Sequence, residues 1–170
     1  PRPTVLERVD TRNYATDVTD LNEALDRYYQ ERYAAVVHGG LGGRVQDLFH
    51  RAIERPFGER DHFGQVLELG ATSGEHLSFV RHSFDRYVML DIRDSSTARQ
   101  NASDFAGKMG APVEFVVGDA QDLSGIASES IDRLVAMCLL HHLPDPVAAL
   151  TNWRRVVRPG GVLSIFLPCD

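Results

Sequence analysis

The sequence predicts an α/β domain built on a doubly wound, mostly parallel sheet. From residue 65 onward, short apolar runs that are typical of buried strands alternate with segments of helical periodicity. The first of these runs leads into a glycine-rich turn, where sheets of this class bind a ligand. The 170 residues, of which 43% are hydrophobic and 25% charged, have the size and composition of one soluble globular domain.

Helices, rather than strands, are expected before this alternating region. Residues 1–17 show no regular pattern, and we expect them to form an irregular arm. A capping box precedes apolar residues at helical spacing over 20–37, which predicts an amphipathic helix there. The glycine-rich residues 38–43 are expected to break this helix, and a second helical pattern over 45–53 stops before Pro56.

The alternating region predicts five strands and three helices. A polar linker over 56–64 precedes the first strand. The last helix has a clear start, because Asp145 suits the N-cap and Pro146 suits the first helical position. The expected strands lie near 65–70, 86–91, 112–117, 131–137 and 161–167, and the expected helices near 73–83, 95–109 and 145–157.

The most informative stretch covers residues 66–76, which read VLELGATSGEH. An apolar run here ends in an acidic residue and then turns through glycines into a predicted helix. Gly70 and Gly74 permit unusual backbone angles and the close approach of a ligand. Residues 70–74, called the glycine turn below, are therefore the first candidate for a binding site.

The charges around the glycine turn indicate what it binds. A dinucleotide fingerprint, G-x-G-x-x-G, requires glycines at the positions that Thr72 and Glu75 occupy. Glu75 in the first helical turn would repel a pyrophosphate, and Glu68 adds a second negative charge nearby. A ligand without phosphate and with some positive character fits these residues better.

These residues resemble the first motif of class I S-adenosylmethionine-dependent methyltransferases, E/D-x-G-x-G-x-G. Glu68, Gly70 and Gly74 match the motif, whereas Thr72 replaces its second glycine. The resemblance continues in order over residues 66–167 and implies a Rossmann-like fold with S-adenosylmethionine as cofactor. The later segments are YVMLD at 87–91, VVGDA at 116–120, DRLVAM at 132–137, HHLPDP at 141–146 and RPGG at 158–161.

Acidic residues at two later strand ends are candidates for binding the adenosine part. Asp91 follows the glycine turn by about 20 residues, the spacing of ribose-binding acids. Its alternative role is a helix cap without a ligand. By resemblance, Asp119 accepts from the adenine amino group and the N–H of Ala120 donates to a ring nitrogen. The alternative for this pair is an ordinary turn.

The resemblance assigns further residues to the cofactor. Glu68 is expected to attract the ammonium of the methionine part, its alternative being a surface acid at the strand end. Gly70 and Thr72 are expected to face the methionine part, mainly through their backbone, and Gly74 is a further cofactor-binding residue. The predicted cofactor set is completed by the carbonyl of Met137 and by Ile92.

Two adjacent histidines, His141 and His142, are the candidate catalytic residues. They follow the fourth predicted strand, where open α/β sheets have their ligand crevice. Because histidine titrates near neutral pH, either one suits deprotonation or positioning of an acceptor. The alternative is a structural pair that packs beside the following helix.

The resemblance also implies how the chain is organised. Residues 1–64 are expected to form the arm and a helical lid, and residues 65–170 the cofactor-binding core. Members of the resembled family continue with a further helix and two strands after the fifth strand. Because the sequence ends just after its fifth predicted strand, we expect the C-terminal strands to be absent and the domain to be truncated there.

Composition restricts the partners. The net charge of −6 disfavours nucleic acid, because phosphate binding requires clustered Lys and Arg. No apolar run approaches membrane-spanning length, and no signal peptide is visible, so we expect a cytoplasmic protein. Cys138 and Cys169 form neither a disulfide framework nor a metal-binding spacing, and we predict no metal site.

Three functions remain open from the sequence. The leading hypothesis is methyl transfer to an oxygen or nitrogen of a small-molecule acceptor. The second is a non-catalytic module that binds S-adenosylmethionine for regulation, and the third is a nicotinamide-dependent oxidoreductase, which Glu75 opposes. The sequence leaves the acceptor and the oligomeric state unknown.

Overall fold

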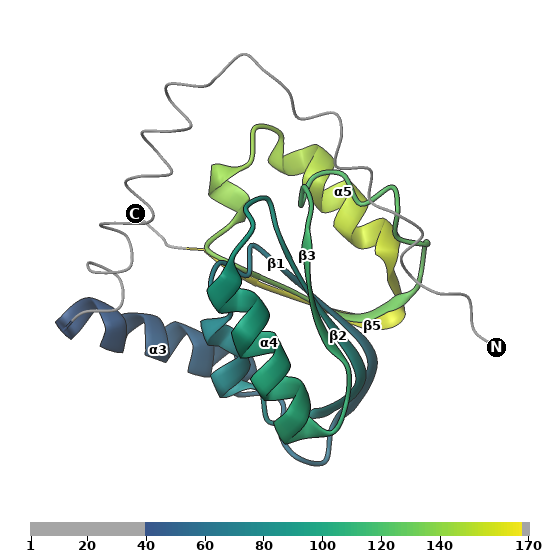
Figure 1. Cartoon of the computed structure of the whole chain (residues 1–170). Coiled ribbons are helices and arrows are strands. Elements are labelled where there is room, and N and C mark those ends of the chain that lie inside the picture. Colours follow the sequence, from purple (N-terminus) through teal and green to yellow (C-terminus); the bar gives the residue numbers. More distant parts are fainter. Residues whose placement is uncertain (1–39, 168–170) are drawn as a thin grey trace. The chain divides into compact units, whose positions relative to one another are not determined.

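A computed structural model describes residues 40–167 (Figure 1). Within them, five parallel strands form one sheet in the order β3-β2-β1-β4-β5. The strands are β1 His62–Leu69, β2 Ser83–Asp91, β3 Val113–Val117, β4 Ile131–Met137 and β5 Val157–Phe166. The helices are α3 Gly40–Glu54, α4 Ser96–Met109 and α5 Pro146–Val156, with short 3-10 helices η3 Glu75–Phe79 and η4 Leu140–His142.

The strand order confirms the doubly wound sheet that the sequence predicts. The chain builds outward from β1 through β2 to β3, and then returns to the other side of β1 with β4 and β5. The connections from β1 and β4 therefore lead in opposite directions, and open α/β sheets have their ligand crevice at the carboxyl ends of two such strands. The glycine turn follows β1, and η4 follows β4, so both begin at this crevice.

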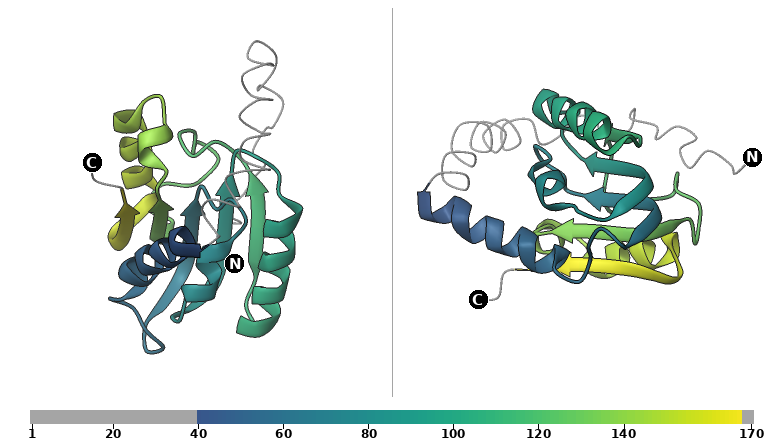
Figure 2. Two further views of the ribbon diagram at one scale, coloured as in Figure 1. Left: turned by 90° about the vertical axis from the view of Figure 1, so that its left-hand side faces the viewer. Right: turned by 90° about the horizontal axis from the view of Figure 1, so that it is seen from below.

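Helices cover both faces of the sheet (Figure 2). On one face, α4 contributes Phe105 to a core cluster that includes Tyr87 of β2. On the other face, α5 contributes Trp153 to a cluster that includes Leu134 of β4. The indole Nε1 of Trp153 donates to the carbonyl of Ala120 over 2.7 Å, so the polar N–H of this buried ring has a hydrogen-bond partner.

The helix boundaries follow from local capping. The side chain of Ser95 accepts from the N–H of Ala98 at the start of α4, and Gly110 ends that helix in the left-handed conformation. Asp145 accepts from the N–H of Ala148 over 2.9 Å, with Pro146 in the first turn of α5. The predicted helices near 95–109 and 145–157 are thus confirmed to within a residue or two.

Four local predictions are wrong. The linker expected over 56–64 already enters β1 at His62. The helix expected over 73–83 is only the five-residue η3, because β2 already begins at Ser83 and packs Phe84 into the core. The strand expected over 161–167 begins at Val157, since the Pro-Gly-Gly segment forms an irregularity in the pairing with β4 rather than a turn before the strand. The break expected over 38–43 is helical from Gly40 onward, as part of α3.

The chain divides between Ala52 and Ile53 into two compact units. The predicted arm over 1–17 and the predicted helix over 20–37 lie outside the described residues. In the part of the chain that is described, no helix combines the length and apolar character needed to cross a membrane.

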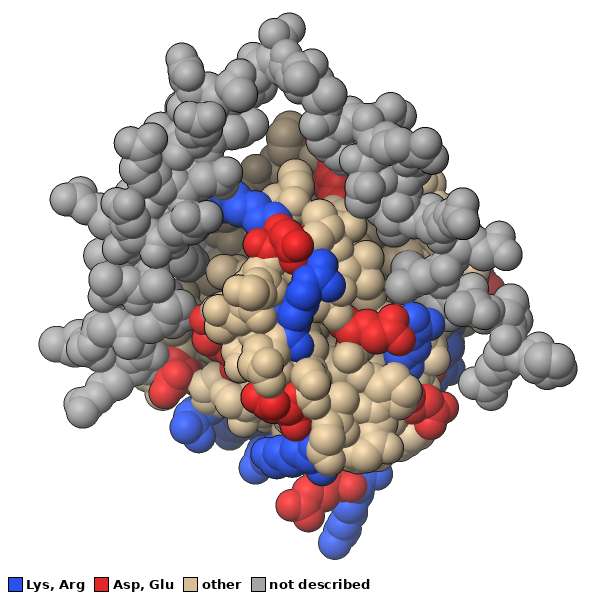
Figure 3. All heavy atoms as spheres, viewed as in Figure 1, with Lys and Arg blue, Asp and Glu red and all other residues tan. Residues whose placement is uncertain are grey.

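Charged side chains of both signs are interspersed on the face drawn in Figure 3. The described residues include surface ion pairs, such as Arg99 with Asp94 over 2.8 Å and Arg86 with Glu114 over 2.7 Å. Exposed pairs of this kind contribute little to stability.

Candidate cofactor site

The glycine turn has an unusual backbone conformation. Gly70, Thr72 and Gly74 all have positive φ angles, of 71°, 50° and 83°. The N–H of Gly70 donates to the carbonyl of Leu90 over 2.8 Å, and the N–H of Gly74 donates to that of Ala71 over 2.7 Å. The first bond holds the turn to β2 and the second closes the turn on itself, so its backbone conformation is well defined.

An added side chain would also be crowded at both glycines. A Cβ at Gly70 would lie 3.1 Å from a methyl group of Leu139, and a Cβ at Gly74 would lie 2.7 Å from the terminal methyl of Met89. Leu139 lies two residues after the end of β4, so the glycine turn adjoins the segment that follows β4. These two segments therefore lie together at the place where the strand order predicts the ligand site.

Thr72 occupies a backbone conformation that β-branched residues rarely adopt. Its φ of 50° is in the left-handed region, which costs an L-residue about 1–2 kcal/mol. Its hydroxyl donates to the carbonyl of Gly70 over 3.3 Å. Strain of this kind accumulates at functional sites, where the surrounding structure maintains it.

Asp91 lies directly beside the glycine turn. Its Oδ2 accepts from the N–H of Thr72 over 2.9 Å, and its Oδ1 accepts from the N–H of Arg93 over 3.0 Å. These two bonds orient the carboxylate at the end of β2. The next residue, Ile92, exposes 58% of its surface, so an apolar side chain is open to a ligand at the end of β2.

Glu68 is buried, with 3% exposed, so it is not a surface acid. Its Oε2 accepts from the Tyr87 hydroxyl over 2.9 Å. Burial raises the pKa of Glu68 above its ordinary value, although the His76 charge and the Tyr87 hydrogen bond oppose this. Burial and the charge of Glu68 raise the pKa of Tyr87 well above its usual range. Glu68 thus faces the core.

The predicted adenine residues follow β3, next to Asp91. The N–H of Gly118 donates to the backbone carbonyl of Asp91 over 2.8 Å. One carboxylate oxygen of Asp119 accepts from the N–H of Gln121 over 2.8 Å, which is the geometry of an Asx turn. The side chain of Ala120 is buried.

The end of β4 is a second strained segment. Met137 is the last residue of this strand and is half-buried, and Cys138 follows with a φ of 49°. The N–H of Cys138 donates to the carbonyl of Phe166 over 2.9 Å, which holds the segment to β5. Burial raises the pKa of the Cys138 thiol, so the thiol stays protonated at neutral pH.

His141 and His142 lie in η4 and are both exposed. Their ring centroids are 3.9 Å apart. Partial burial, and then the neighbouring His141, lower the pKa of His142. A neutral imidazole is therefore available at His142 at neutral pH.

Contacts between neighbouring segments bring most of the predicted site residues together at the carboxyl ends of the strands. Gly70 meets Leu139, Thr72 bonds Asp91, and Asp91 bonds Gly118. The turn after β1 thus contacts the segment after β4 and the end of β2, and the end of β2 contacts the turn after β3. Glu68 differs, because its side chain faces the core rather than this end of the sheet.

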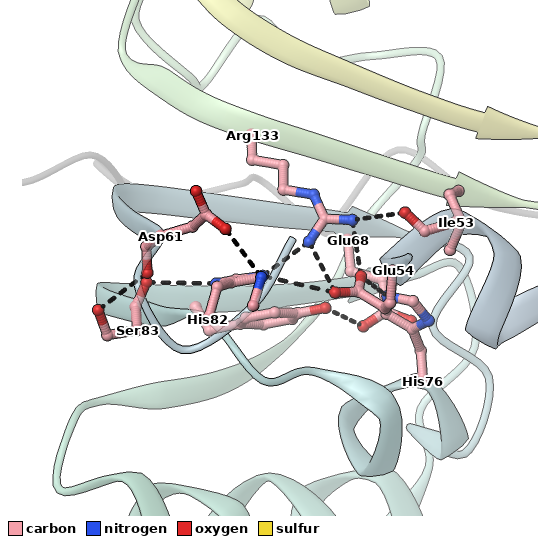
Figure 4. Close-up of polar contacts among 10 residues, drawn as sticks. Ile53, Glu54, Asp61, Glu68, His76, His82, Ser83 and Arg133 are labelled. Atoms are coloured by element: carbon pink, nitrogen blue, oxygen red, sulfur yellow. Dashed lines mark hydrogen bonds and ion pairs between the residues drawn. The ribbon is translucent and has the colours of Figure 1, made fainter. Parts of the chain in front are cut away.

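One cluster of polar residues was missed by the sequence predictions. Glu54, His76, His82 and Arg133 lie buried together and face Glu68 (Figure 4). Hydrogen bonds and ion pairs from Arg133 and His76 converge on Glu54. The four residues come from separate positions in the chain. Only Arg133, a charged residue inside the apolar strand β4, signalled the cluster in advance. Among residues 40–167, no group of three or more His, Cys, Asp or Glu side chains is arranged to hold a metal ion.

Comparisons with known proteins agree with this geometry. A family model described as a methyltransferase domain matches residues 67–165. Trans-aconitate 2-methyltransferase of Deinococcus radiodurans is 32% identical over 146 residues, which cover 85% of this chain and 49% of that protein. Fumosorinone synthetase of Cordyceps fumosorosea is 33% identical over 155 residues, which cover 88% of this chain and 4% of the synthetase.

Solved structures share the fold. The PH0226 protein of Pyrococcus horikoshii matches with a TM-score of 0.55 and 22% identity, over 79% of this chain and 62% of that one. The chain spans about half the length of the trans-aconitate enzyme and a small part of the synthetase. The family model covers more than half of the sequence, so the chain belongs to the class I S-adenosylmethionine-dependent methyltransferases.

Proposed function

We propose that this chain transfers a methyl group from S-adenosylmethionine to an oxygen or nitrogen of a small-molecule acceptor. The observation that supports this most directly is the Asp91 carboxylate, which the N–H of Thr72 holds beside the glycine turn. A carboxylate in this place accepts from ribose hydroxyls, while the turn offers backbone to the methionine part of the same cofactor.

The adenosine part is proposed to lie along the ends of β2 and β3. Asp91 binds the ribose, and the exposed Ile92 packs against the adenine ring, since a ligand that covers it removes apolar surface from water. Asp119 accepts from the adenine amino group, and the N–H of Ala120 donates to a ring nitrogen. The Asx turn at Asp119 supports this by fixing the loop.

The methionine part is proposed to lie against the glycine turn and the end of β4. Gly70, Thr72 and Gly74 present backbone at positive φ, and the Met137 carbonyl accepts from the ammonium group. Because Glu68 is buried, its contribution is the electrostatic attraction of its charge rather than direct contact. The alternative of a dinucleotide is disfavoured by Glu75, which follows Gly74 directly.

S-adenosylmethionine supplies a methyl group on a sulfonium, a good leaving group, so the protein mainly orients the acceptor in line with the C–S bond. The acceptor lone pair forms the new bond to the methyl carbon as the C–S bond breaks. We propose that His142, or His141 beside it, takes the proton that the acceptor loses. The lowered pKa of His142 supports this, because the neutral ring is the base.

The test is turnover with methyl-labelled S-adenosylmethionine against a panel of carboxylic acids, phenols and amines, read by mass spectrometry. Carboxylic acids come first, because one relative is named for methylating trans-aconitate. For an acceptor that must lose a proton, His142→Ala or His141→Ala should reduce kcat by roughly 100-fold or more, with cofactor affinity unchanged. Full turnover in both single variants would reject a base at this position.

A second candidate is a non-catalytic module that binds S-adenosylmethionine. The strained Thr72, where the family motif has glycine, is the observation that favours it. This candidate predicts cofactor binding without labelled product from any acceptor in the panel. Labelled product from a single acceptor excludes it.

The remaining parts of the proposal concern the whole protein. Residues 1–64 are proposed to act as arm and lid, residues 65–170 as the cofactor-binding core, and the small-molecule acceptor as the partner. The cytoplasm is the proposed location. Limited proteolysis with and without S-adenosylhomocysteine tests the lid. If residues 1–64 close over the cofactor, the ligand should protect them from cleavage.

A further inference from the structure

A buried polar cluster lies beside the proposed cofactor site and has no part in the proposed chemistry. It consists of Glu54, His76, His82 and Arg133, each at most 2% exposed. They come from the last residue of α3, from η3, from the segment just before β2, and from β4. Figure 4 shows these side chains pointing toward one another.

Glu54 is the centre of the cluster. Its Oε1 accepts from Nη2 of Arg133 over 2.6 Å and from Nε2 of His76 over 2.9 Å, and its Oε2 accepts from Nη1 of Arg133 over 3.1 Å. This pairing with Arg133 is bidentate, the strong and directional form of the interaction. The two hydrogen bonds therefore fix the orientation of both side chains, and the opposite charges stabilise each other.

His82 is bonded to the same arginine on its other side. Nη1 of Arg133 donates to Nε2 of His82 over 2.7 Å, so His82 accepts there and carries its proton on Nδ1. That Nδ1–H donates to the carbonyl of Ser83 over 3.2 Å. Burial and the charge of Arg133 lower the pKa of His82, in agreement with a neutral ring. His82 thus belongs to the cluster but has no bond to η3.

His76 is the residue that connects the cluster to the glycine turn. It is the second residue of η3, which begins directly after Gly74. The backbone bonds of η3 are long, at 3.3 Å from Leu77 to Gly74 and 3.3 Å from Val80 to Leu77. A five-residue 3-10 helix with such bonds does not fix its own position well. Leu77 packs into the core from η3, and the His76–Glu54 bond adds a directional polar constraint at its start.

Buried ion pairs often contribute less stability than apolar packing would, so stability alone does not explain this cluster. The cluster also joins the end of α3, the stretch from η3 to the start of β2, and β4 at one point. We propose that His76 and Glu54 are positioning residues, which hold η3 against Arg133 and so keep the glycine turn in its cofactor-binding conformation. This rests on the proposed placement of the cofactor on that turn.

The experiment compares two buried histidines of the same cluster. His76→Leu removes the bond from η3 to Glu54. His82→Leu removes the bond to Arg133 and the 3.9 Å contact with Glu54, neither of which involves a residue of η3. Both variants keep the Arg133–Glu54 pair. His76→Gln is the rescue variant, because its amide nitrogen takes the place of Nε2 and still donates to Glu54. Affinity for S-adenosylhomocysteine is measured by calorimetry at a temperature where circular dichroism shows each variant folded.

We expect His76→Leu to raise the Kd for S-adenosylhomocysteine about ten-fold, as the fraction of competent turn conformations falls to about a tenth. His76→Gln and His82→Leu should stay within about two-fold of the original chain, even though His82→Leu is less stable. Hydrogen exchange at the amides of Gly74 and Leu77 should accelerate in His76→Leu and not in His82→Leu. This readout separates positioning from general destabilisation.

Equal affinities in His76→Leu and His82→Leu would overturn the positioning role. If His76→Leu does not fold, Glu54→Gln replaces it, with the same direction of change expected and an unchanged Kd overturning the proposal. Asp91→Ala is measured in parallel. If it weakens binding while the cluster variants do not, the positioning role alone is wrong. If Asp91→Ala also has no effect, the proposed placement of the cofactor has failed.

Discussion

The backbone N–H of Thr72 donates to the side-chain Oδ2 of Asp91 over 2.9 Å, which joins the glycine turn to the end of β2 through one carboxylate. Asp91→Ala should therefore weaken binding of S-adenosylhomocysteine by about 1–3 kcal/mol, the scale for losing hydrogen bonds to a charged group. Calorimetry measures this. Asp94→Ala is the matched control, because Asp94 is exposed and pairs with Arg99 instead. Equal affinities in the two variants would contradict the ribose assignment.

Thr72→Gly should relieve backbone strain. The positive φ of 50° costs threonine about 1–2 kcal/mol, part of which is offset by the greater freedom of glycine in the unfolded chain. We expect the free energy of unfolding to be equal or higher in urea titrations. Thr151→Gly, in the middle of α5, should lower it by a few tenths of a kcal/mol. A loss of more than about 1 kcal/mol in Thr72→Gly would show that its side chain stabilises the turn.

Gly74→Ala should harm both stability and cofactor binding. The φ of 83° strains alanine, and its Cβ would lie 2.7 Å from the terminal methyl of Met89. We expect a loss of about 1–3 kcal/mol in the free energy of unfolding. Gly107→Ala, in α4 with no heavy atom within 4 Å of the added Cβ, should instead gain roughly 0.5–1 kcal/mol. Thermal unfolding of the two variants should therefore shift in opposite directions.

Glu54 should make stability depend on pH. Burial alone would raise its pKa, but hydrogen bonds from His76 and Arg133 and the charge of Arg133 outweigh burial and lower the pKa from 4.5 to about 2. The ionised carboxylate thus stabilises the folded state above pH 4.5, and this contribution is lost as the pH falls toward 2. At neutral pH it amounts to about 3 kcal/mol by linkage.

Urea unfolding of Glu54→Gln across this pH range tests the account. The original chain should be more stable than Glu54→Gln at neutral pH, and the difference should shrink below pH 4.5. Glu59→Gln, at an exposed position, should remain within about 0.5 kcal/mol of the original chain. Parallel curves for Glu54→Gln and the original chain would mean that the Glu54 carboxylate is not stabilised by its partners.

The sequence predicts elements well where local signals define both ends. The strand over 131–137 has the predicted bounds, and α4 and α5 begin where Ser95 and Asp145 supply caps. The helix expected over 73–83 failed for a non-local reason. Leu77 and Val80 have helical spacing, but packing of β2 against the sheet takes the chain into an extended conformation from Ser83.

The proposed site divides in the same way. Asp91 and the glycine turn form a pattern within one stretch of chain, so their proximity was predictable from the doubly wound order. The Glu54–His76–Arg133 cluster joins residues up to 79 positions apart, and no local pattern relates them. The inward orientation of Glu68 was missed for the same reason, since it depends on Tyr87 of the neighbouring strand β2.

The most direct test of the central claim is calorimetric titration of the purified chain with S-adenosylhomocysteine, with NAD as the parallel ligand. The proposed site predicts micromolar binding of S-adenosylhomocysteine, weakened in Asp91→Ala, and no binding of NAD. Binding of NAD, or binding of S-adenosylhomocysteine that Asp91→Ala leaves unchanged, would contradict it.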